Sequence, residues 1–147
     1  MKTLLKYILS IQKISIFSLA LVLPPSAFGG HVAGSENINT TRLQELMQQN
    51  VPLYDVRRQD EWQQTGIIEG ARTLTFVDHQ GRLKEDFLAR FTAEADKDKP
   101  VIVMCRSGKR SDALTHYLVN KMGYTHVYNL RDGIVNWIYE KKPVVSP

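Results

Sequence analysis

The chain has 147 residues, the usual length of one domain, with 19 Lys and Arg against 15 Asp and Glu. Three of the lysines lie in the first 29 residues, which contain no acid, so the rest of the chain carries 16 cationic side chains against 15 acidic ones. The remaining domain is therefore near neutral, its basic overall charge gives no support for nucleic-acid binding, and we expect no nucleic-acid partner.

The first 29 residues have the layout of a secretory signal peptide. Lysines precede an apolar run from Ile14 to Leu23, two prolines then break any helix, and small residues follow up to Gly29. We predict cleavage after Gly29, a mature domain over 30–147, export to the bacterial periplasm and no stable membrane insertion afterwards. The alternative is a retained inner-membrane anchor, but this apolar run is about half of the ~20 residues that a spanning helix needs.

The first half of the mature chain alternates helical and strand-like patterns. Thr41 and Gln44 have the spacing of a capping box, and the apolar face that follows predicts a helix up to about Asn50. The next expected elements are a strand over 51–56, a helical turn over 60–64, a strand over 71–77 and a turn over 78–81.

The second half continues the alternation. Leu83, Phe87 and Phe91 recur every four residues, which predicts a helix. The most apolar strand covers 101–104, and it is followed by a helix to Met122, a strand over 125–130 and a last helix that stops before Pro143. Strands alternating with helices predict an α/β fold with a mainly parallel sheet of four to five strands and helices on both faces.

Cys105 is the only cysteine, and it stands between the most apolar strand and a basic turn. Parallel sheets bind ligands at the carboxyl ends of their strands, which is where this cysteine is expected. It has no internal disulfide partner, and an unused free thiol is a liability in an oxidising compartment. We interpret Cys105 as a functional residue, because the alternative of an inert core cysteine leaves the basic turn unexplained.

The turn from Cys105 to Arg110, the cradle loop, is suited to hold an anion. Its backbone N–H groups and the start of the next helix favour negative charge, and thiols held there beside Arg and Lys react as thiolates at neutral pH. Gly108 permits the backbone angles of a tight turn, and Ser111 is a candidate donor to the sulfur or to substrate oxygens. The predicted site has Cys105 as nucleophile and the following substrate-binding set: Arg106, Ser107, Gly108, Lys109, Arg110 and Ser111.

The spacing of Cys105 and Arg110 separates two families that use such a loop. Cysteine phosphatases have C-x5-R-S/T, in which the arginine clamps a phosphate, whereas this chain has C-x4-R followed by Ser111. The shorter loop suits a single sulfur atom better than a tetrahedral phosphate. It resembles the active-site loop of rhodanese-type sulfurtransferases. A cysteine phosphatase or an arsenate reductase is the alternative enzyme.

The resemblance to rhodaneses extends over about 38–143. LYDVRRQDEW, TGIIEGARTL and MGYTHVYNLRDGIVNW resemble three further motifs of that family. Two residues depart from them, because Ile67 occupies the usual histidine position and Asp132 replaces the first glycine of the last motif. With the export signal, the chain resembles a periplasmic single-domain rhodanese, which implies a rhodanese-like three-layer fold and a monomer.

The resemblance implies a double displacement on Cys105. The thiolate takes the outer sulfur of thiosulfate or a related small anionic donor, and cyanide or a thiol then accepts that sulfur from the persulfide. The cations of the loop attract the donor, and no metal or organic cofactor is needed. Asp55 and Arg57 are interpreted as a supporting salt bridge beneath the loop. A non-catalytic rhodanese module that holds a sulfur species or a partner protein is the remaining alternative, which the intact loop weakens.

Overall fold

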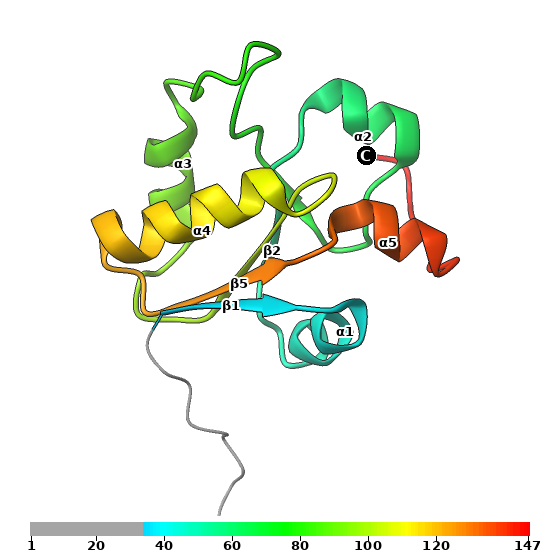
Figure 1. Cartoon of the computed structure of the whole chain (residues 1–147), viewed down its shortest axis with the longest axis horizontal. Coiled ribbons are helices and arrows are strands. Elements are labelled where there is room, and N and C mark those ends of the chain that lie inside the picture. Colours follow the sequence, from blue (N-terminus) through cyan, green and yellow to red (C-terminus); the bar gives the residue numbers. More distant parts are fainter. Residues whose placement is uncertain (1–33) are drawn as a thin grey trace, which may run out of the picture.

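The computed structural model describes residues 34–147, so the predicted signal peptide, residues 1–29, lies outside the described residues. In the described part, five strands alternate with five helices (Figure 1). In chain order they are β1 Gly34–Ile38, α1 Thr40–Gln48, β2 Leu53–Asp55, α2 Gln59–Thr65, β3 Arg72–Thr73, α3 Phe87–Glu94, β4 Val101–Met104, α4 Lys109–Met122, β5 His126–Leu130 and α5 Gly133–Tyr139.

The strands form one sheet in the order β1-β5-β4-β2-β3, and every pairing is parallel. Strand β4 lies in the middle, and all four of its residues are buried. Such a continuous apolar run is typical of a parallel strand that is covered on both faces. The predicted α/β fold with a parallel sheet is confirmed.

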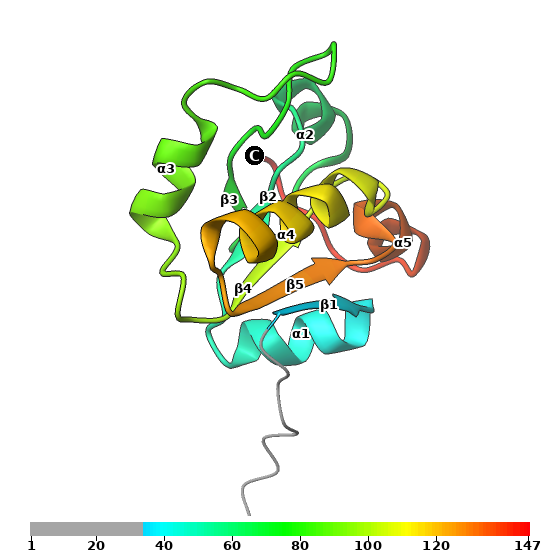
Figure 2. The same cartoon turned by 60° about the vertical axis from the view of Figure 1, so that its left-hand side comes forward.

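Helices cover both faces of the sheet. Phe87 and Phe91 of α3 pack with Leu114 and Leu118 of α4 in one core cluster, while the other cluster contains Leu43 of α1 and residues of α5. Figure 2 shows α1 and α4 on opposite sides of the sheet. These are the three layers that the sequence predicts, and they leave the carboxyl ends of the strands at one edge.

The N-terminal part of the domain differs from the expectation in one capping box and in one strand that was not expected. The N-cap of α1 is Asn39, whose side chain accepts the Arg42 N–H at 2.8 Å, so Thr41 and Gln44 form no capping box. Strand β1 has no counterpart among the expected elements. It is an edge strand with mostly exposed polar residues, and only Ile38 is buried, so it lacks the apolar pattern that marks a strand.

The segment between β2 and α3 also differs from the expectation. The strand predicted over 71–77 is reduced to β3, although the N–H groups of Leu74 and Phe76 still bond to β2 and the residue after it. Leu83 is not in a helix, since α3 begins at Phe87, and Leu83 instead pairs with Val77 in an isolated bridge. Local spacing predicts a helix there, but this bridge holds the chain in a bend.

Candidate active site

Strand β4 carries Cys105 to the carboxyl edge of the sheet, as predicted. Only 1% of the residue is exposed, and it belongs to the core cluster beneath α4. In the following loop, Arg106, Ser107 and Lys109 are exposed and Gly108 is buried. The sulfur therefore lies under the loop, while the flexible cationic side chains point to solvent.

The backbone of the cradle loop leaves its N–H groups free. Within residues 34–147, no hydrogen bond joins an N–H group of Arg106 to Arg110 to a protein acceptor. Helix α4 begins at Lys109, so the positive end of its dipole adds to these donors. The hydroxyl of Ser111 lies 3.4 Å from Cys105 Sγ and 3.0 Å from the Gly108 carbonyl oxygen. This set of donors suits an anion at the sulfur.

Two glycines fix the loop against the start of α5. Gly108 has φ +87°, and a Cβ at this position would lie 1.7 Å from the Arg131 carbonyl oxygen. Gly133 has φ +61°, and its Cβ would lie 2.3 Å from the Arg106 carbonyl oxygen. Both sites therefore exclude any side chain, and Gly133 allows the Ile134 N–H to donate to the Cys105 carbonyl at 3.0 Å.

The three cations of the loop have different surroundings. Arg110 binds Glu61 of α2 through two hydrogen bonds, at 2.6 and 2.8 Å. In the part of the chain that the structure describes, Arg106 and Lys109 form no ion pair. The charge of Arg110 is thus compensated by a carboxylate, and the uncompensated positive charge of the loop belongs to the other two.

Glu61 is itself held by the start of its own helix. Its carboxylate accepts the backbone N–H of Arg58 at 3.0 Å and forms an ion pair with the Arg58 side chain. Burial is the largest influence on the pKa of Glu61 and raises it, but the bonds from Arg110 and Arg58 together outweigh it. The pKa of Glu61 therefore lies below its usual value, and the group is a carboxylate at neutral pH.

Asp55 and Arg57 form the buried salt bridge that the sequence predicts. The Arg57 Nη2 lies 2.6 Å from Asp55 Oδ2, and both side chains are at most 1% exposed. Arg57 also donates to the Thr65 hydroxyl and the Gly66 carbonyl at the end of α2. None of these bonds reaches the cradle loop. The role of Arg57 is therefore to fix α2, the helix that carries Glu61.

The two departures from the family motifs leave this geometry intact. Ile67 bonds to Val145 through its backbone N–H and carbonyl, contacts that any residue type can make. Asp132 is the N-cap of α5 with φ −102°, an angle that needs no glycine. The close approach to the loop is made by Gly133, which the chain retains.

Comparison with known proteins identifies the family of this chain. The sequence profile of the rhodanese-like domain family matches residues 39–140. The chain belongs to this family. Thiosulfate sulfurtransferase GlpE of Pseudomonas savastanoi pv. phaseolicola is 30% identical to it over 102 residues, which cover 69% of this chain and 86% of that protein. A protein of Allochromatium vinosum named sulfurtransferase is 44% identical over 55 residues, covering 37% of this chain and 50% of that protein.

Solved structures show the same fold. A rhodanese-related protein from Thermoplasma volcanium superimposes with a TM-score of 0.59 at 24% identity, over 76% of this chain and 99% of that one. The rhodanese-like three-layer architecture that the resemblance implies is thereby confirmed.

Sequence reasoning gave no role to two residues of this rhodanese-like site. Glu61 and Gly133 both lie inside the quoted motifs, and their positions in those motifs are the only signal that marks them. Their partners, Arg110 and Arg106, are far away in the chain. Contacts between residues so far apart in the chain leave no short sequence pattern that would predict them.

In residues 34–147, no group of three or more His, Cys, Asp or Glu side chains is arranged to hold a metal ion. No helix in the same range is long and apolar enough to cross a membrane.

Proposed function

We propose that this rhodanese-like protein is a sulfurtransferase that carries sulfur as a persulfide on Cys105. The observation that carries the proposal is a buried thiol at the head of a loop whose backbone N–H groups are free and which leads directly into α4. Relatives named sulfurtransferase and thiosulfate sulfurtransferase support sulfur transfer as the general activity. Thiosulfate as donor and cyanide or a thiol as acceptor are proposed because the resemblance to rhodaneses implies them.

The first half-reaction takes sulfur from thiosulfate. The Cys105 thiolate attacks the outer sulfur, a new S–S bond forms, and sulfite leaves with the electron pair of the broken S–S bond. The product is a persulfide anion, whose outer sulfur accepts hydrogen bonds from the amides of the cradle loop. The Ser111 hydroxyl, 3.4 Å from Sγ, is positioned to support the inner sulfur.

The second half-reaction regenerates the thiolate. Cyanide or an acceptor thiolate attacks the outer sulfur, forms a C–S or S–S bond, and displaces Cys105 as a thiolate. The two half-reactions together need no external oxidant or reductant. The chemistry needs no metal or organic cofactor.

Recognition of a dianionic donor is assigned to Arg106 and Lys109. Both are exposed residues of the cradle loop and form no ion pair within residues 34–147, so their charge attracts an anion and stabilises departing sulfite. Arg110 remains a predicted substrate-binding residue, but its guanidinium already binds Glu61. That pairing also argues against the phosphatase alternative, because a phosphatase needs this arginine free to clamp a phosphate.

The test uses purified protein with thiosulfate and cyanide, and it follows thiocyanate. We expect thiocyanate from the wild type and none from Cys105→Ser. Intact mass after thiosulfate alone should rise by one sulfur in the wild type only. A wild-type protein that gains no sulfur and forms no thiocyanate contradicts the proposal and supports the non-catalytic module. Hydrolysis of an aryl phosphate that depends on Cys105 supports the phosphatase.

Export to the periplasm and a monomeric state are further parts of the proposal. Export is supported by the lysines, apolar run and small residues of 1–29. Osmotic-shock fractionation of bacterial cells, with N-terminal sequencing of the product, tests export and cleavage after Gly29. Recovery in the membrane fraction with the leader intact supports the retained anchor instead, and light scattering of the purified protein tests the monomer.

A further inference from the structure

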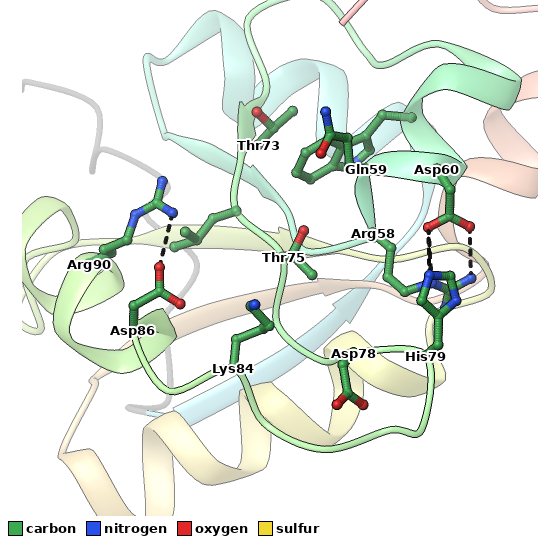
Figure 3. Close-up of a pocket in the computed structure, with 12 residues that line it drawn as sticks. Arg58, Gln59, Asp60, Thr73, Thr75, Asp78, His79, Lys84, Asp86 and Arg90 are labelled. Atoms are coloured by element: carbon green, nitrogen blue, oxygen red, sulfur yellow. Dashed lines mark hydrogen bonds and ion pairs between the residues drawn. The ribbon is translucent and has the colours of Figure 1, made fainter.

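A second concave site lies beside α2, away from Cys105. This α2 pocket has a volume of about 460 Å³ and is bounded by the start of α2, by the chain around β3 and by the segment leading into α3 (Figure 3). None of the residues of the cradle loop lines it. The volume lies within the ~300–1,000 Å³ that is usual for small-molecule sites.

The acidic groups of the α2 pocket are already paired. Asp60 binds Arg58 at 3.1 Å and Asp86 binds Arg90 at 3.4 Å, as Figure 3 shows. Asp78 binds Arg82, which lies outside the pocket, at 2.7 Å. These pairs leave no carboxylate that needs a cationic ligand.

Lys84 is an unpaired cation of the α2 pocket. In the described part of the chain, the Lys84 ammonium has no ion pair or hydrogen bond, and Figure 3 shows it reaching in among the lining residues. The indole N–H of Trp62 is buried and also lacks a partner there. This nitrogen is not accessible from the pocket, but Trp62 itself lines the pocket, so its indole signal can report a ligand bound there. The hydroxyls of Thr73 and Thr75 line the same space.

We propose that the α2 pocket binds a small organic molecule with one carboxylate. The carboxylate pairs with Lys84, and a second polar group of the ligand hydrogen-bonds with the hydroxyl of Thr73 or Thr75. The Trp62 ring and Leu74 supply apolar contact for the hydrocarbon part. Dianions gain nothing from their second carboxylate, because Arg58 and Arg90, the other cations of the pocket, are already paired with Asp60 and Asp86.

This site is independent of sulfur transfer, although a chain of ion pairs links it to the cradle loop. Arg58 lines the α2 pocket and also binds Glu61, which in turn binds Arg110 of the cradle loop. The lack of any gain from a second charge separates the pocket from the proposed thiosulfate site, which attracts a dianion. Binding in the α2 pocket can therefore be tested whether or not Cys105 transfers sulfur.

The test observes the indole N–H groups directly. The chain has two tryptophans, Trp62 and Trp137, so a ¹⁵N–¹H spectrum of the labelled protein shows two indole signals. Trp62→Phe assigns them by loss of one signal, and Trp137→Phe serves the same purpose if that variant does not fold. The probes are N-acetylglycine, its neutral amide and succinate.

We expect N-acetylglycine to shift the Trp62 signal in a saturable way and to leave the Trp137 signal in place. Lys84→Gln should weaken this binding roughly tenfold or more, since a charge-assisted hydrogen bond is lost. Lys121→Gln, which removes an exposed lysine of α4, is the matched control and should bind as the wild type does. The neutral amide should bind more weakly than N-acetylglycine, and succinate should bind no more tightly than N-acetylglycine.

Three results overturn the proposal. The first is a Trp62 signal that does not move at saturating N-acetylglycine. The second is equal binding of N-acetylglycine and its neutral amide, and the third is unchanged affinity in Lys84→Gln. Lys84 is exposed, so that variant is expected to fold and each result is interpretable.

Discussion

Arg110 and Glu61 form a two-pronged ion pair that joins the first turn of α4 to α2. The two bonds measure 2.6 and 2.8 Å, and the side chains are 24% and 7% exposed. The pair connects the last residue of the cradle loop to a helix 49 positions earlier in the chain. It therefore anchors the loop that covers Cys105 and leaves the charges of Arg106 and Lys109 uncompensated.

Removing the Glu61 charge should destabilise the fold. In Glu61→Gln the amide keeps the shape of the side chain, but Arg110 loses its counter-charge in a partly buried site. We expect a loss of about 1–3 kcal/mol in the free energy of unfolding, measured with urea. Glu45→Gln breaks the exposed Arg42 pair and should cost less than about 1 kcal/mol. Equal losses in the two variants would contradict the anchoring role.

The same ion pair should make stability depend on pH. The pKa of Glu61 is lower in the folded protein than in the unfolded chain, where it is about 4.3. A lowered pKa contributes stability that is complete above the unfolded value and is lost as the pH falls through the folded value. The stability difference between wild type and Glu61→Gln should thus be constant above about pH 5 and shrink below about pH 4.3. Urea unfolding from pH 7 to pH 3 checks this, and a constant difference over the whole range would refute it.

Gly133→Ala should displace the cradle loop. The new methyl group would lie 2.3 Å from the Arg106 carbonyl oxygen, so the backbone beside Cys105 must move. We expect loss of at least 90% of sulfur transfer and a lower unfolding midpoint. Gly123→Ala is the matched control, because Gly123 also has a positive φ, +74°, but its Cβ meets nothing within 4 Å. In that variant the free energy of unfolding should fall by only about 1 kcal/mol, and the activity should be retained.

Arg57→Met should be the most destabilising of these substitutions. It leaves Asp55 as a buried carboxylate without its partner and removes the bonds to the end of α2. We expect the free energy of unfolding, measured with urea, to fall by roughly 3–5 kcal/mol. Arg82→Met breaks the Asp78 pair, in which the arginine is 76% exposed, and should cost less than about 1 kcal/mol. If both variants unfold at the same urea concentration, the buried pair does not brace α2.

The central part of the fold and the cradle loop were predictable because their signals are local. The apolar run of β4, the lone cysteine, Gly108 and the start of α4 are neighbours in the chain, and each has a pattern with a single structural meaning. The exposed edge strand β1 and the bend around Leu83 lack such patterns. They are determined by pairing with residues elsewhere.

The parts of the site that escaped prediction are contacts between distant segments. Glu61 reaches Arg110 across the sheet edge, and Gly133 meets Arg106 only after β5 has returned beside β4. Spacing rules describe one helix or one strand at a time. They carry no information about which two loops meet at the carboxyl edge.

The burial of Cys105 has a consequence for the behaviour of the protein in air. A disulfide between two copies needs Cα atoms about 4.4–6.8 Å apart, and Cys105 is 1% exposed beneath its own loop. Two folded copies cannot approach that closely. Covalent dimers should therefore not accumulate in a non-reducing gel after storage, and only small molecules can consume the thiol while the loop stays closed.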